Sequence, residues 1–213
     1  MKTIKSFLKG VLFLLGVAAA ACFFAPWKQL GESAAILASR RLRAPSSLSW
    51  SAVKNVPGGF ALVNLSASRL GGVADISCET LTVEPDLAAS VLNMAPTCRL
   101  TFAGLLLDGV AVTPSKKYPG AFIGNGRVTV SVGRRGILLE GLRSGGDLSL
   151  DGDLMIDFAA ERPIVWADLA MNVKYEPFEK ETLPPLQNIL PLRQEAQGRW
   201  RLRRTPARSE ELL

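Results

Sequence analysis

The stretch DLSLDGDLMIDF, residues 147–158, decides the fold class of this chain. Its even positions are almost all aliphatic, and its odd positions carry Asp147, Asp151, Asp153 and Asp157. Because successive side chains of a strand point to opposite faces, the alternation predicts a strand with one apolar and one solvated face. Alternate residues lie about 6.6–6.8 Å apart, too far to share a proton without a neighbouring strand. The run also lacks the ligand order of a calcium loop, so we interpret the aspartates as solvent-facing.

The same alternation, punctuated by glycine, continues from residue 48 onward. Further strands are expected at 165–174, 127–132 and 199–203, with weaker ones at 60–66, 76–84, 98–103, 105–112 and 136–142. Turns are expected at Gly58-Gly59, Gly71-Gly72, Gly124-Asn125-Gly126 and Gly145-Gly146. Short helices are expected at 86–92, after Pro85, and at 186–192, among prolines. Consecutive strands with short turns predict a mainly β fold, a twisted antiparallel sheet with one or two short helices.

The N-terminal segment carries a separate signal, an uncharged run of 18 residues from Gly10 to Trp27. At about 1.5 Å per residue, such a run is just long enough to cross a membrane as a helix. Lysines ahead of it predict a cytoplasmic N-terminus, namely Lys2, Lys5 and Lys9. The side chains expected to form the anchor are Val11, Leu12, Phe13, Leu14, Leu15, Phe23, Phe24 and, at the interface, Trp27.

Two alternatives to an uncleaved anchor remain open. Small residues at 17–21 suit cleavage of a signal peptide, and Cys22 is where a lipoprotein would carry its lipid. The apolar run continues past both sites, and the large aliphatic residue usual three positions before a lipidated cysteine is missing, so we favour the anchor. All three alternatives export the rest of the chain.

A helix is expected from Leu30 to Arg43, with Leu30, Ala34, Leu37 and Ala38 on one face. Pro45 ends it, and we interpret it as a juxtamembrane stalk or plain linker helix. The expected organisation is a cytoplasmic N-terminus at 1–9, an anchor at 10–27, a helix and linker at 28–46, a β-domain at 47–205 and a tail at 206–213.

Composition excludes several function classes. The chain has 213 residues, a net charge of +6 and no histidine, so it has no Ser-His-Asp or Cys-His pair and no His-ligated zinc. Three cysteines are too few for an all-cysteine zinc site. The positive charge is concentrated in the N-terminal lysines and in arginines at 199–208, and the neutral remainder argues against a nucleic-acid partner. We expect neither an enzyme nor a cofactor.

Two further sets of residues are candidate sites. Cys78 and Cys98 flank the short helix at 86–92, and in an oxidising compartment they either form a disulfide or remain as two buried thiols. Arg199, Arg201 and Arg203 either contact a partner or lipid headgroups, or form the solvated face of an edge strand, where charge discourages strand pairing. We favour the solvated face.

Several phrases of the sequence resemble the type II secretion system protein N family, whose style is related to AsmA-like periplasmic sheets. LTVEPDLAASVL at 81–92 resembles the family's strand that runs into a P-D-L-x-x-L-L helix, and TFAG at 101–104 followed by LDG at 107–109 resembles the next strand and turn. GGDLSLDG at 145–152 is similar to its G-G-x-L-x-L-x-G hairpin. The stretch 184–202 resembles its terminal helix and G-x-Y-x-L strand, with Trp200 in the aromatic place, but 203–206 departs from the usual G-T-L ending.

The resemblance implies an accessory subunit of the type II secretion machinery, anchored in the inner membrane by a single N-terminal span. The bulk of the chain is then periplasmic and binds other secretion subunits rather than turning over a substrate. No family motif is catalytic, so the resemblance implies no active-site residue. The alternative is an AsmA-like lipid-handling or envelope-maintenance protein, suggested by strands that are apolar on both faces, such as 105–107 and 137–139.

Overall fold

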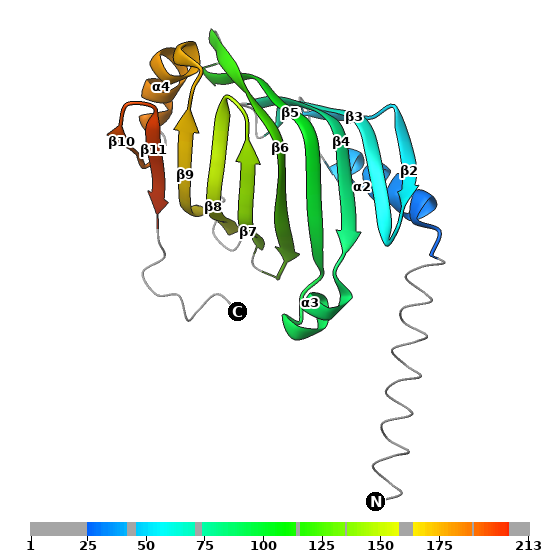
Figure 1. The fold of residues 1–213 in the computed structure, drawn as a ribbon. Coiled ribbons are helices and arrows are strands. Elements are labelled where there is room, and N and C mark those ends of the chain that lie inside the picture. The colour runs from blue at the N-terminus through cyan, green and yellow to red at the C-terminus, as the bar shows by residue number, and fades with distance from the viewer. Residues whose placement is uncertain are drawn as a thin grey trace, which may run out of the picture.

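The computed structural model describes residues 25–41, 46–70, 74–113, 116–134, 136–157, 164–188 and 190–204. These residues form one curved antiparallel sheet of eleven strands with short helices at its margins (Figure 1). The mainly β, antiparallel prediction is confirmed. Within the described ranges, no helix has the length and apolar character needed to span a bilayer. The predicted topology lysines and the anchor residues from Val11 to Phe24 lie outside those ranges.

The strands follow one another as a meander, in the order β1-β3-β4-β5-β6-β7-β8-β9-β11-β10, with β2 paired to β3. Their bounds are β1 Ser47–Ser49, β2 Ala52–Val56, β3 Gly59–Leu70, β4 Ala74–Pro85, β5 Thr97–Thr113, β6 Lys116–Val132, β7 Gly136–Gly145, β8 Leu148–Asp157, β9 Ile164–Val173, β10 Leu192–Ala196 and β11 Arg199–Arg204. The helices are α2 Trp27–Arg41, α3 Leu87–Leu92, the π-helix η1 Phe178–Thr182 and α4 Leu183–Gln187.

Register separates the sheet into an apolar and a polar face. Leu150 pairs with Met171 and Leu154 pairs with Ala167, whereas Asp153 pairs with Asp168 on the opposite face. Directly paired residues of antiparallel strands share a face, so the alternation in each strand is propagated across the sheet. The prediction that the aspartates of residues 147–158 face away from the aliphatic side chains is confirmed for Asp151 and Asp153, both of which are exposed.

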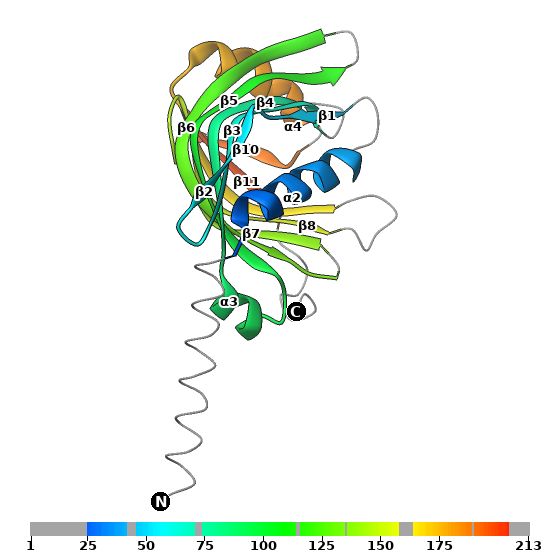
Figure 2. The ribbon, with the colours of Figure 1, turned by 90° about the vertical axis from the view of Figure 1, so that its right-hand side faces the viewer.

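Bulges bend the long central strands β5 and β6. Their pairing shifts register between Phe102 and Leu105, where Gly104 has a φ of 63° and Gly124 a φ of 76°. The Asn125 side chain accepts a hydrogen bond of 3.0 Å from the Gly104 amide and holds this irregularity in place. Since a bulge bends its strand and increases the local twist, the sheet curls into the deep trough seen in Figure 2.

Three local predictions are wrong. Gly124-Asn125-Gly126 lies inside β6 instead of forming a hairpin turn, because its glycines serve the bulge and let the backbone pass close to Phe102. The predicted strands 98–103 and 105–112 are one strand, and 127–132 is the second half of another. The second helix begins at Phe178 rather than at residue 186, since Pro184 and Pro185 are accepted in the first turn of α4. The helix after Pro85 is confirmed, with Asp86 as its N-cap.

Helix α2 packs on the sheet and is not a free-standing linker. Its Ala35 is buried with Val53 and Phe60 of β2 and β3, and α2 occupies the mouth of the trough (Figure 2). A Cβ on Gly31 would lie 2.6 Å from the Phe60 ring, so glycine is what allows this close approach. Leu30 and Leu37, which the sequence places on one face of the helix, are exposed, and the helix buries Gly31 and Ala35 against the sheet instead.

Candidate functional site: the concave surface

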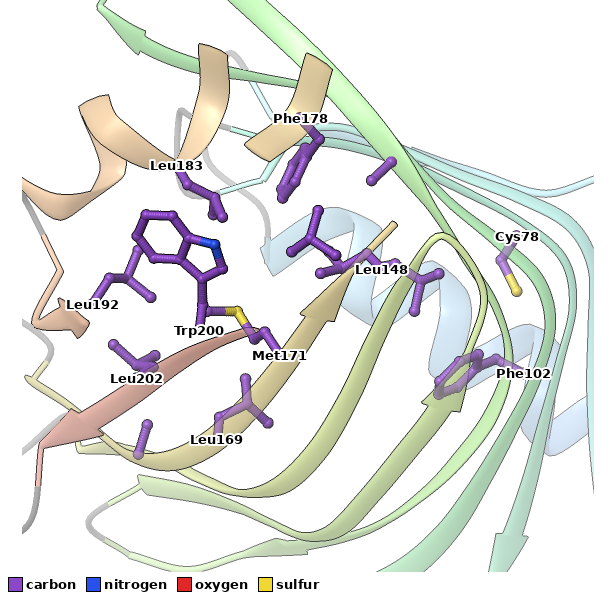
Figure 3. Close-up of a cluster of buried hydrophobic side chains, with 14 residues drawn as sticks. Cys78, Phe102, Leu148, Leu169, Met171, Phe178, Leu183, Leu192, Trp200 and Leu202 are labelled. Atoms are coloured by element: carbon purple, nitrogen blue, oxygen red, sulfur yellow. The ribbon is translucent and has the colours of Figure 1, made fainter. Parts of the chain in front are cut away.

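The inner face of the curled sheet is an apolar surface that runs across most of the strands. We define the concave surface as the side chains that share this face with Leu62, Leu81, Phe102, Val128, Leu139, Leu154, Leu169 and Leu202. The curl brings Cys78 of β4 and Leu202 of β11 into one hydrophobic cluster, although five strands lie between them (Figure 3). The surface is therefore a property of the bent sheet and not of any single strand.

The segment η1–α4 closes one end of the trough. Phe178 and Leu183 are 2% and 1% exposed and pack with Trp200 and Met171, which point into the same interior (Figure 3). Thr182 is fully buried, and its hydroxyl donates a 2.8 Å hydrogen bond to the Pro119 carbonyl of β6. That bond joins η1 to β6, which is separated from β9 by β7 and β8 in the sheet, so the segment η1–α4 reaches back over the end of these strands.

A single carboxylate organises the polar side of this cap. Oε1 of Glu179 accepts hydrogen bonds from the Gly198 amide at 2.8 Å, from the Trp200 indole at 3.1 Å and from the Gln194 side chain at 3.2 Å. Hydrogen bonds to a charged acceptor are stronger than neutral ones, and a buried indole N–H needs a partner. Glu179 thus fixes η1 to the β10–β11 hairpin.

Helix α2 covers the concave surface at the other margin, over β2 and β3. Between the two covers, the concave side chains of the central strands are only half-buried, among them Leu100, Val130, Ile137, Leu139, Leu154 and Ile156. Half-buried aliphatic side chains side by side form a surface that gains free energy when a further apolar group removes it from water. This central part of the concave surface is the candidate binding site.

The central concave surface is lined by aliphatic side chains, which suit contact with an apolar group. No group of three His, Cys, Asp or Glu side chains that would suit a metal ion occurs among the described residues. Acidic side chains gather instead on the convex face, where Asp168 accepts a 2.9 Å hydrogen bond from Arg201 and Asp153 accepts one of 2.7 Å from the Gly141 amide.

The predicted cysteine pair is not brought together. Cys98 pairs with Pro85, seven residues further along β4 than Cys78, which corresponds to about 23 Å at ~3.3 Å per residue. A disulfide needs Cα atoms within about 7 Å, so the structure supports the alternative of two free thiols. Burial raises the pKa of both thiols, for Cys78 against hydrogen bonds to the Thr80 and Ala103 carbonyls that lower it.

The three arginines share one solvated face but do not lie at the edge of the sheet. Arg199, Arg201 and Arg203 project from β11, and β10 pairs with β11 and covers it. The edge-strand prediction is wrong because the chain folds back through a hairpin at 197–198. Arg201 binds Asp168 and lies 3.8 Å from Glu195, which raises the pKa of its guanidinium.

The sequence interpretation missed η1 and its contacts. Phe178, Thr182 and Glu179 lie in FEKETLPP, a short segment between strands with two prolines and four charged or hydroxyl residues. Its pattern suits a surface loop as well as a helix, so periodicity alone does not reveal it. The contact partner Pro119 is 63 residues away from Thr182 along the chain, and only the fold brings the two together.

Comparison with known protein families gives a match along nearly the whole chain. The profile described as type II secretion system protein GspN-like, Synergistales, matches residues 4–204. Searches of curated proteins and of solved structures find no match. The match covers the N-terminal run, α2 and the entire curved sheet with its caps. The chain therefore belongs to the GspN-like family of type II secretion system proteins.

Proposed function

We propose that this protein is an accessory structural component of the type II secretion system, anchored in the inner membrane by residues 10–27. Its β-domain lies in the periplasm and binds other secretion subunits through the central concave surface. The observation that carries the proposal is the family match over residues 4–204. The half-buried aliphatic side chains between α2 and η1–α4 supply a surface of the right chemistry for a partner.

Adjacent residues of β7 allow a matched test of this surface. Ile137 pairs with Ile156 on the concave face, and Leu138 pairs with Met155 on the convex face. Both side chains are half-buried, so a lysine at either position meets a similar degree of burial. The variants Ile137→Lys and Leu138→Lys therefore differ chiefly in the face of the sheet that they alter.

The experiment replaces the native gene with each variant and follows a secreted enzyme together with co-purification from detergent-solubilised membranes. We expect Ile137→Lys to reduce both secretion and recovery of the other secretion subunits, while Leu138→Lys retains them. Thermal unfolding of both purified variants controls for loss of the fold. Unchanged secretion in a deletion strain, with no secretion subunit co-purifying, would falsify the proposal.

A second candidate function is lipid handling in the envelope, and one observation favours it. The apolar concave surface is continuous from β3 to β11 and open between its two covers, which suits an acyl chain as well as a protein segment. Mass spectrometry of the purified full chain tests this candidate by measuring retained phospholipid. Retention that Ile137→Lys abolishes and Leu138→Lys preserves supports lipid handling; no retained phospholipid in the native chain rules it out.

A further inference from the structure

Helix α3 and the turn after it expose an apolar surface at the end of the sheet opposite η1. We define the α3 tip as Leu87, Val91, Leu92, Met94 and the neighbouring Val132 of β6. Val91, Leu92 and Met94 are 77%, 81% and 94% exposed, and no residue of α3 is buried. Packing on the sheet therefore does not explain why these side chains are apolar.

The α3 tip is held by polar contacts of its backbone. The Asp86 carboxylate accepts a 2.9 Å hydrogen bond from the Ala89 amide, and the Ser90 hydroxyl accepts one of 2.8 Å from the Thr97 amide. The Val132 amide donates to the Pro96 carbonyl at 2.9 Å, which ties the turn to β6. The apolar side chains are thus presented on a fixed scaffold and are free to contact something else.

Two features of the α3 tip indicate that its apolar character serves a contact. Met94 has a φ of 47°, a left-handed conformation that glycine or asparagine usually occupies after a helix. A long apolar side chain is therefore kept at a strained and almost fully exposed position. Beside it, Pro85, Cys98, Val91 and Val132 line a shallow depression of about 580 Å³.

The position of the first described residues indicates which partner the α3 tip contacts. The amide of Lys28, at the start of α2, donates a 2.6 Å hydrogen bond to Asn55, next to the β2–β3 turn. Gly59 of that turn lies against the carbonyl of Val83, two residues before the end of β4, from which the chain enters α3. The start of α2 and the α3 tip thus lie at one end of the domain (Figures 1 and 2).

The 24 residues ahead of that point contain most of the uncharged run that begins at Gly10. If this run spans the membrane, it leaves the bilayer at the end of the domain that carries the α3 tip. Arg134 is exposed two residues after Val132, and Arg99 is 56% exposed beside Asp86. Arg99 is paired with Asp86, which leaves Arg134 as the basic side chain beside the tip. Exposed apolar side chains with a basic residue nearby suit the boundary between acyl chains and anionic headgroups.

We propose that the α3 tip inserts its apolar side chains into the membrane that holds the N-terminal run, as a second, interfacial contact. This inference rests on the anchor of the proposed function and adds an orientation to it. A single point of attachment leaves a domain free to rotate, whereas two points of attachment fix its direction. The concave surface is then presented to partners at a constant angle to the bilayer.

The test uses the full chain reconstituted in phospholipid vesicles that contain anionic lipid, with and without acyl chains brominated near the headgroup. Leu92→Trp adds a fluorophore at the α3 tip, and Tyr175→Trp adds one at an exposed apolar position next to η1, at the far end of the domain. Bromine quenches tryptophan only on close contact. We expect brominated lipid to remove most of the emission that Leu92→Trp adds over the native chain, and none of that added by Tyr175→Trp.

Flotation of the same vesicles separates this inference from the proposed function. If the chain does not float with the vesicles after alkaline washing, the anchor fails. If the chain floats but the emission added by Leu92→Trp is not quenched, the anchor stands and the interfacial contact is overturned. A blue shift that appears only at high protein density, without lipid quenching, assigns the α3 tip to a second copy of the chain and also overturns the proposal.

Discussion

Two short helical segments at opposite ends of the sheet differ in almost every physical respect. The segment η1–α4 hides Phe178, Thr182 and Leu183 almost completely, whereas α3 leaves Leu92 and Met94 more than four-fifths exposed. Both segments begin within two residues of a proline and are preceded by a strand. Helix formation itself therefore does not decide burial. The difference comes from the curl of the sheet, which folds β6 over η1 and leaves α3 beyond the ends of its neighbours (Figure 2).

The comparison separates residues that stabilise the fold from residues available for a contact. The fold itself removes the apolar side chains at η1 from water, so their burial stabilises the folded state. Apolar side chains at α3 are in water until a membrane or partner covers them. Substitutions at the two ends should therefore affect different measurements, stability at one end and association at the other.

The largest expected effect is on stability, from Phe178→Ala in η1. Loss of a buried aromatic side chain should lower the free energy of unfolding by about 3–5 kcal/mol, because the cluster with Trp200 and Met171 loses its contacts and gains a cavity. Denaturant unfolding of the detergent-solubilised chain measures it. Leu92→Ala is the matched control and should change stability by less than about 0.5 kcal/mol. Equal losses in the two variants would contradict the comparison.

The next effect concerns the polar side of the cap. Glu179→Ala should cost about 1–3 kcal/mol, since the Trp200 indole and the Gly198 amide lose their shared acceptor. Glu179→Gln keeps an acceptor oxygen in place, so it should lower the free energy of unfolding less than the alanine variant does. Near-ultraviolet circular dichroism of Trp200 reports the local packing in both. A glutamine variant as unstable as the alanine variant would show that shape, and not the acceptor, holds η1.

At the α3 tip, Met94→Gly should raise stability while weakening the membrane contact. The left-handed conformation costs a non-glycine residue about 1–2 kcal/mol, and glycine at this position removes that cost. Glycine also loses about 0.5–1 kcal/mol more backbone entropy on folding, which offsets part of the gain. The net gain in the free energy of unfolding should be about 1 kcal/mol or less. Met94→Ala keeps the strain and should give no gain. In the Leu92→Trp background, both variants should reduce quenching by brominated lipid.

The smallest effect is a pH dependence at the η1 end. Lys117 lies 2.7 Å from Asp75 and, together with the Arg69 amide, holds the pKa of that carboxyl below its usual value of about 3.9. Because the folded pKa is the lower one, the contribution is complete above about pH 4 and is lost as the pH falls through the folded pKa. For an exposed pair it amounts to about 0.2–1 kcal/mol. In Lys117→Met, the free energy of unfolding should depend less on pH below about pH 4 than in the native chain. An unchanged pH dependence would show that the pair between Lys117 and Asp75 does not cause it.

Much of the sheet was predictable from alternation, but its long strands were not. The run 147–158 predicted β8 to within one residue at each end, since one strand face is strictly polar. Gly124-Asn125-Gly126 was interpreted as a turn, because the same residue types serve turns and bulges and only the partner strand distinguishes them. The free thiols of Cys78 and Cys98 also depended on register, which spacing in the sequence does not give.

The candidate site was predictable in kind but not in extent. Alternation predicts that each strand has an apolar face, and therefore that something must cover it. It does not say which strands remain uncovered, because α2 and η1–α4 reach their positions through contacts with residues far away in the sequence. Helical spacing placed Leu30 and Leu37 on one face of the first helix, but it did not reveal that the helix packs on the sheet through Gly31 and Ala35, close to Phe60.

The sequence by itself determined the strand class, the two faces of the sheet, the short helix after Pro85 and the family, because each follows from local periodicity, the position of a proline or motif order. The tertiary structure alone decided the curl, the closure of one end by η1 and the exposure of the other end at α3. Those features depend on bulges and on contacts such as that between Thr182 and Pro119, whose partners are distant in the sequence. Local patterns fix which face is apolar, and the bending of the whole sheet fixes how much of that face is left open.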